Sequence, residues 1–174
     1  MKSNTRRLVA AAVVGAVYAA LTMCLAPISY GAVQFRVSEV MCVLPFFLPW
    51  TSWGLFLGCA LSNVISSAGI LDVVFGSLAT LASCLCIAAL GRCDAPGLGR
   101  KILACLMPVM FNGVIIGAVL AWVSVPRDGF WAAMALFGAQ VAGGEAAVLF
   151  ILGLPALCWL PKQSFFRKIL VSYK

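Results

Sequence analysis

The stretch "YGAVQFRVSEV", Tyr30 to Val40, separates two strongly apolar runs and places polar side chains between them. The run at residues 8–26 reads "LVAAAVVGAVYAALTMCLA", and the run at residues 41–50 reads "MCVLPFFLPW". A helix that crosses the hydrocarbon core of a bilayer needs about 20 mostly apolar residues, so residues 8–26 predict a spanning helix. Irregular backbone at membrane depth must be enclosed by protein or line a cavity. We therefore expect the polar stretch to line an enclosed site.

The composition indicates a membrane protein. Of the 174 residues, 64% are apolar and 10% are charged, whereas soluble domains are roughly 45–50% apolar and about 25% charged. The sequence therefore predicts an all-α integral membrane protein, a compact six-helix bundle in one domain spanning residues 1–174. The predicted spans are 8–26, 37–50, 53–67, 70–90, 102–124 and 131–160. The second and third spans are short, which predicts either one broken hairpin or short helices packed inside the bundle.

The basic residues predict the orientation of the chain. With six spans, ten of the twelve Lys and Arg residues fall on the side of the two termini, and only Arg36 and Arg127 fall on the other. Basic residues accumulate on the cytoplasmic side of membrane proteins, so both termini are predicted to be cytoplasmic. This distribution explains the net charge of +7 without nucleic-acid binding.

Charged side chains within or next to apolar segments form the candidate site. The four are Arg36, Glu39, Asp72 and Glu145, and the amides Gln34, Asn63, Asn112 and Gln140 accompany them. Charges at membrane depth are costly unless they pair or face a water-filled cavity. The six-span topology brings the four charges and the amides Asn63, Asn112 and Gln140 to the outer half of the bundle, as in a polar pocket for a small molecule. Gln34 belongs to the polar stretch that contains Arg36 and Glu39. If ionised, the four charges sum to −2, which favours a cationic ligand or one rich in N–H groups.

Each of these residues also has a purely structural interpretation. Arg36 and Glu39 are three residues apart and can pair on one face of a helix. A salt bridge between Arg36 and Glu145 would likewise satisfy both groups. Asn63 and Asp72 can serve as interface residues or helix caps.

The sequence contains no catalytic or metal-binding constellation. It has 8 cysteines and no histidine, which excludes a Ser-His-Asp triad and an HExxH zinc site. The CxC pair of Cys84 and Cys86 is poor metal spacing, and no GxxxxGK[ST] phosphate loop occurs. We therefore expect no enzymatic activity, no cofactor and no metal, with the cysteines serving as small packing residues.

Small residues recur every four positions along the first predicted span. One register contains Ala11, Gly15 and Ala19, and the other contains Ala12, Ala16 and Ala20. Stripes of this kind let another helix approach closely. The spacing leaves open which register faces a partner, and whether that partner is another helix of the same chain.

Five blocks of the chain resemble the QueT family and occur in the same order. They are "APISYGAVQFRVSEVMCVLPFF" (26–47), "GLFLGCALSN" (54–63), "ILDVVFGSLATL" (70–81), "MPVMFNGVIIG" (107–117) and "GGEAAVLFILGLP" (143–155). Members of this family are S components, the substrate-binding subunits of energy-coupling factor transporters, and are associated with uptake of queuosine precursors.

The resemblance implies a multi-pass protein of the bacterial cytoplasmic membrane that binds a 7-deazaguanine on its extracellular side. It also implies a transmembrane T component and two cytoplasmic ATPases as partners. The T component would be contacted through the small residues of the first helix, drawn from Ala12, Gly15, Ala16, Ala19 and Ala20. The alternatives are an S component for another vitamin-like molecule, a proton- or ion-coupled secondary transporter using Asp72 and Glu145, and a membrane scaffold without a ligand.

Overall fold

The computed structural model describes residues 2–31, 33–66, 68–92 and 97–173, and across these ranges the regular structure is entirely helical. This confirms the predicted all-α class. In chain order the elements are α1 (Lys2–Cys24), α2 (Ala26–Ser29), the 3-10 helix η1 (Val37–Phe46), α3 (Thr51–Asn63), the π-helical turn η2 (Asp72–Gly76), α4 (Ser77–Leu90), α5 (Leu98–Ser124), η3 (Arg127–Gly129), α6 (Phe130–Val148), the π-helical turn η4 (Leu149–Gly153), α7 (Leu154–Trp159), η5 (Leu160–Lys162) and α8 (Ser164–Ser172).

Within the described ranges, four helical stretches are long and apolar enough to cross a membrane. They are Asn4–Cys24, Asp72–Leu90, Leu98–Ser124 and Arg127–Lys162. The elements η1 and α3 contain 10 and 13 residues, and each extends for roughly 20 Å at the rise of its helix type. That length is well short of a hydrocarbon core of about 30 Å, so neither element has the length of an ordinary membrane-spanning helix.

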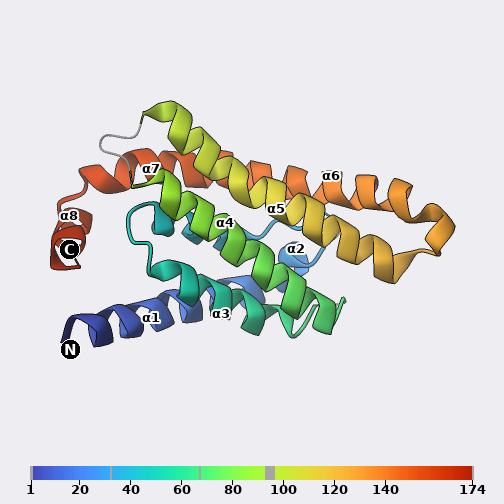
Figure 1. Ribbon diagram of the computed structural model, residues 1–174, viewed down its shortest axis with the longest axis horizontal. Helices are drawn as coiled ribbons and strands as arrows, with labels where there is room; N and C mark the ends of the chain where they lie inside the picture. The colour runs from blue at the N-terminus through green and yellow to red at the C-terminus, as the bar shows by residue number, and fades with distance from the viewer. Residues whose placement is uncertain (1, 32, 67, 93–96, 174) are drawn as a thin grey trace.

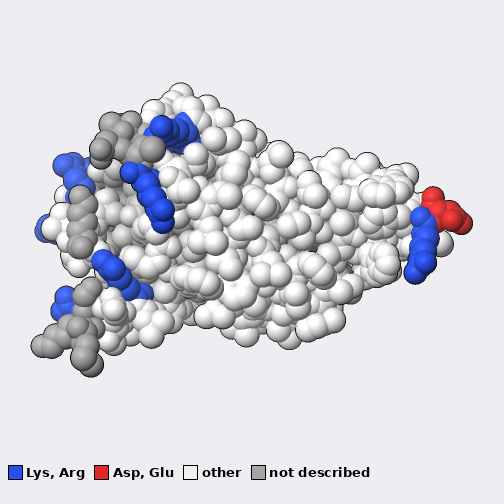
Figure 2. All heavy atoms as spheres, in the orientation of Figure 1, with Lys and Arg blue, Asp and Glu red and all other residues white. Residues whose placement is uncertain are grey.

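The helices lie side by side and run in alternating directions, so that both ends of the chain lie near the same end of the molecule (Figure 1). Helix α1 packs against α3, α3 and α5 both pack against α4, and α5 packs along α6. Basic side chains gather at the end where the chain begins and finishes, and the middle of the visible surface carries no charge (Figure 2). The few charges at the far tip belong to the turn η3.

Glycines bring α1 and α3 into backbone contact. A Cβ atom on Gly15 would overlap the carbonyl group of Gly54, and one on Gly58 would overlap the carbonyl group of Gly15. The register containing Ala11 and Ala19 is therefore buried against α3, with 7% and 3% of these side chains exposed. The other register, Ala12, Ala16 and Ala20, remains exposed on the outer surface of α1. Tertiary packing thus distinguishes two registers that the spacing left equivalent.

Candidate ligand site

Seven of the eight predicted site residues are buried inside the bundle. Gln34 is 6% exposed and the other six are at most 2% exposed: Arg36, Glu39, Asn63, Asp72, Asn112 and Glu145. The eighth, Gln140, is half-buried on α6, and no described hydrogen bond joins it to the other seven. Burial of this many polar groups is unfavourable unless they are hydrogen-bonded, so the partner of each group indicates its role.

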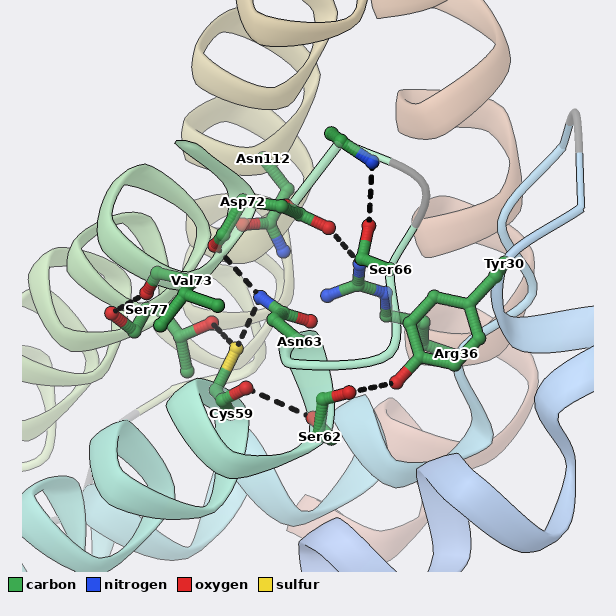
Figure 3. A network of polar contacts seen from close by, with 12 residues as sticks. Tyr30, Arg36, Cys59, Ser62, Asn63, Ser66, Asp72, Val73, Ser77 and Asn112 are labelled. Carbon is green, nitrogen blue, oxygen red and sulfur yellow. Dashed lines mark hydrogen bonds and ion pairs between the residues drawn. The ribbon is translucent and has the colours of Figure 1, made fainter. Parts of the chain in front are cut away.

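Arg36 forms an ion pair with Asp72. Its Nη2 atom lies 3.5 Å from Asp72 Oδ2, and its guanidinium group lies 5.6 Å from the centre of the Tyr30 ring (Figure 3). Asp72 opens the π-helical turn η2, a rare geometry that recurs at functional sites. The pairs of Arg36 with Glu39 or Glu145, considered from the sequence, are not formed, because Arg36 turns toward η2 instead.

Glu39 is held by helix α1 and by its own helix. The Tyr18 hydroxyl donates a hydrogen bond to Glu39 Oε1, and the Cys42 thiol donates to Oε2 at 3.0 Å. Beside them, the hydroxyl groups of Thr22 and Ser38 are 2.6 Å apart. Both carboxyl oxygens of Glu39 are therefore satisfied by the protein. These contacts identify Tyr18 and Thr22 as residues that fix η1 against α1. The predicted contact of Glu39 with a ligand stays a prediction.

Asn63 connects the end of α3 to η2. Its Nδ2 atom donates to the carbonyl oxygen of Asp72 at 3.0 Å and to the sulfur of Cys59 at 3.5 Å. The close approach requires Gly76, where a Cβ atom would lie 2.6 Å from Asn63 Nδ2 and 2.8 Å from Asp72 Oδ1. Gly76 was not identified from the sequence, because the residues around it do not indicate a contact with Asn63, thirteen positions earlier.

The segment between α2 and η1 covers this cluster. The Tyr30 hydroxyl donates to the carbonyl oxygen of Ser62 at 2.5 Å (Figure 3). Burial raises the pKa of Tyr30, which keeps its hydroxyl protonated and able to donate. On the other side, a Cβ atom on Gly144 would lie 2.7 Å from the Val33 carbonyl oxygen and 2.8 Å from that of Gln34. Glycine at 144 thus lets this segment rest on α6, directly beside Glu145 in the chain.

Glu145 on α6 is oriented by Asn112 on α5. Asn112 Nδ2 donates to Glu145 Oε1 at 2.8 Å, and this contact holds one of the two carboxyl oxygens. Glu145 Oε2 is buried and has no hydrogen-bond partner among the described residues. The carboxyl group is therefore held in place through one oxygen, and the other oxygen remains free to accept a hydrogen bond.

Several other buried polar atoms of the cluster also lack a hydrogen-bond partner within the described part of the chain. They are the acceptors Asn63 Oδ1 and Asp72 Oδ1 and the donors Arg36 Nε and Nη2. Nη2 takes part in the ion pair with Asp72, but 3.5 Å is too long for a good hydrogen bond. Each buried unsatisfied group costs about 1–3 kcal/mol. A small molecule that presents several N–H groups and one carbonyl oxygen would satisfy this set of atoms.

The comparisons with known proteins agree on one family. The family model described as QueT transporter matches residues 8–162. Over 82 residues the chain is 43% identical to the protein named queuosine precursor transporter QueT from Lactococcus lactis subsp. cremoris (strain MG1363), a match covering 46% of this chain and 48% of that relative. The matched region is thus about half the length of the curated relative. No solved structure matches the chain.

Proposed function

This chain belongs to the QueT transporter family, and from that premise we propose that it is the substrate-binding S component of an energy-coupling factor transporter. Its ligand would be a 7-deazaguanine precursor of queuosine, captured on the extracellular side of the bacterial cytoplasmic membrane. The family is one of transporters rather than enzymes. The four helical stretches of membrane-spanning length in the described residues support a multi-pass membrane protein.

The proposed topology has six passes with both termini in the cytoplasm, η1 and α3 being the two short passes. The two ends of the chain lie near one end of the molecule (Figure 1), and basic side chains gather there (Figure 2). Because basic residues favour the cytoplasmic side, this end would face the cytoplasm. The candidate site includes Tyr18 near the end of α1, Asn63 at the end of α3 and Asp72 before α4. These positions lie toward the other membrane surface, which supports capture from outside.

The proposed ligand is inferred from the buried polar atoms that lack a hydrogen-bond partner among the described residues. A 7-deazaguanine presents N–H donors at N1 and at its amino group, beside a carbonyl acceptor. We propose that Glu145 Oε2 and Asp72 Oδ1 accept hydrogen bonds from the N–H groups, and that Arg36 Nε donates to the carbonyl oxygen. Hydrogen bonds to ionised groups are the stronger ones. An aminomethyl substituent on the deazaguanine would add a positive charge that suits a site rich in carboxyl groups.

The buried site requires movement of a covering segment before a ligand can enter. The residues that would contact it are at most 2% exposed. We propose that the described residues 30–31 and 33–36 act as a lid, because Tyr30 is held by its hydrogen bond to Ser62, and Val33 and Gln34 are held by packing on Gly144. Binding would then exchange the ion pair of Arg36 and Asp72 for contacts with the ligand.

The partner surface is proposed to be the exposed small-residue register of α1, made of Ala12, Ala16 and Ala20. A groove of about 260 Å³ between α1 and α3 is lined by Ala12 and Ala16 of this register and by the exposed Trp53 and Leu57 of α3. This surface would receive the T component, which in turn recruits the two ATPases. Gly15, also predicted from the sequence to contact the T component, packs against α3 and lines the same groove, whereas the side chain of Ala19 is 3% exposed.

Ligand-dependent stabilisation of the purified protein tests the proposed function. A ligand present at 100 times its dissociation constant stabilises the folded state by about 2.7 kcal/mol, which a thermal denaturation experiment detects. We expect an upward shift of Tm with 7-aminomethyl-7-deazaguanine, and a smaller shift with the analogue that lacks the 2-amino group. Absence of any shift with a panel of deazaguanines would refute the ligand assignment. Uptake that survives loss of the ATPases but collapses with the proton gradient would favour a secondary transporter.

A further inference from the structure

A cavity lies at the basic end of the molecule (Figure 2), away from the candidate ligand site. Its volume is about 500 Å³, and its lining includes Arg7, Phe46, Phe47, Trp50, Leu170 and Tyr173. None of the residues of the candidate site lines it. The cavity is lined by α1, by the end of η1 and the turn that follows it, by Gly91 after α4, and by the C-terminal part of the chain around α8, so its walls come from four separate parts of the chain.

The cavity combines one guanidinium group with aromatic walls. Arg7 Nη2 donates to the carbonyl oxygen of Tyr173 at 2.6 Å, and the Tyr173 ring lies 4.9 Å from the Trp50 ring. Arg7 Nε is buried, and no hydrogen-bond partner is found for it within the described residues. Nor does any described carboxylate form a salt bridge with Arg7. Among the described residues, the guanidinium group is thus fixed in the wall with its Nε donor and its positive charge uncompensated.

Helix α8 indicates that the cavity lies at the level of the lipid headgroups. Phe166 packs against the ring of Phe47, with ring centres 5.4 Å apart, and so fixes α8 to the bundle. Phe165 and Val171 are 73% and 75% exposed, whereas Arg167 on the same helix is basic. Helix α8 thus exposes apolar side chains next to basic ones, a combination that suits a position at the membrane interface. The gathering of Lys and Arg at this end (Figure 2) also suits a surface next to anionic lipid.

We propose that this cavity binds the headgroup of an anionic phospholipid. The phosphate would accept a hydrogen bond from Arg7 Nε, because guanidinium groups match phosphate oxygens in geometry and charge. The glycerol and the first acyl carbons would lie against Phe46, Trp50 and Leu170. A bound lipid would then link α1 to α8 and stabilise the packing of α8 on the bundle. This site is independent of the transport proposal, since it shares no residue with the ligand site.

The test compares Arg7→Gln with Arg6→Gln in the full chain. Arg6 is the matched control, because it precedes Arg7, carries the same charge and is exposed. Each protein is purified and titrated with phosphatidylglycerol or phosphatidylcholine, and lipid retention is measured by native mass spectrometry alongside Tm. We expect the parent and Arg6→Gln to prefer phosphatidylglycerol. In Arg7→Gln its retention should fall by roughly tenfold or more, the factor expected for one lost charge-assisted hydrogen bond.

Three results would overturn the proposal. One is equal retention of the two lipids by the parent protein. Another is that Arg7→Gln keeps the preference for phosphatidylglycerol, or loses it only to the same extent as Arg6→Gln. The third is displacement of the lipid by inorganic phosphate or glycerol phosphate at similar concentrations, which would indicate a site for a soluble anion. If Arg7→Gln does not fold, cross-linking of a photoactivatable phosphatidylglycerol to the parent protein tests the site instead. We expect labelling within 46–50 or 170–173, and labelling confined to other segments would refute the site.

Discussion

Replacing Glu145 by Gln tests whether the buried carboxyl group of α6 binds the ligand or instead stabilises the folded protein. In the empty protein, Glu145 Oε1 accepts the hydrogen bond from Asn112 Nδ2 at 2.8 Å, while Oε2 has no partner among the described residues. Gln has nearly the same shape, and its carbonyl oxygen can keep the bond to Asn112. Its NH2 group then occupies the position of Oε2, so a donor faces the N–H groups of the proposed ligand.

The magnitude follows from this change of an acceptor to a donor. A hydrogen bond to a charged group contributes about 1.5–3 kcal/mol, and 1.4 kcal/mol corresponds to a factor of ten in affinity. We therefore expect the affinity for a 7-deazaguanine to fall by roughly tenfold to a hundredfold. The free energy of unfolding of the empty protein should stay the same or rise slightly, since a buried carboxyl group is replaced by a neutral amide that keeps its contact with Asn112.

The assay is thermal denaturation of the parent and Glu145→Gln, each with and without ligand, together with direct binding by calorimetry. Gln140→Ala serves as the comparison, because Gln140 is only half-buried on the same helix and lies outside the hydrogen-bonded cluster. We expect Gln140→Ala to keep the parental affinity. A Glu145→Gln protein that is less stable when empty, yet binds the ligand as tightly as the parent, would refute the reasoning and make Glu145 a structural residue.

Three further predictions concern α1 and the topology. Gly15→Leu should destabilise the isolated protein, because the leucine side chain would overlap the backbone of α3. Ala16→Leu should leave the thermal stability intact but weaken co-purification with the T component. Unchanged co-purification of Ala16→Leu would contradict the proposed partner surface. Tyr18→Phe should reduce the free energy of unfolding by about 1–3 kcal/mol, measured by denaturation, because it leaves a buried carboxyl oxygen without its donor. In a background without reactive native cysteines, a cysteine that replaces Gly129 should react with a membrane-impermeant reagent added on the extracellular side. A cysteine that replaces Pro96, a position not among the described residues, should not react. The reverse result would show that the topology is inverted.

The sequence by itself was sufficient for the class of the protein and for the list of candidate groups. Long apolar runs at membrane length predict helices because the free energy of transfer depends on composition along the chain, and the described residues are helical as predicted. The predicted QueT family is confirmed by the match over residues 8–162. Charges in apolar surroundings also stand out from composition alone. That criterion selected Arg36, Asp72 and Glu145, which the structure places in the bundle interior.

Tertiary structure alone decided which of these groups meet. The pairing of Arg36 with Asp72 joins residues 36 positions apart, and it depends on how far each helix is rotated about its axis. A local pattern carries no information on that rotation, and this is why the hydrogen bond between Tyr18 and Glu39 was not predicted. The choice between the two small-residue registers of α1 has the same origin. Glycines on α3 admit the backbone of α1 on one side only, and the opposite side of α1 stays exposed.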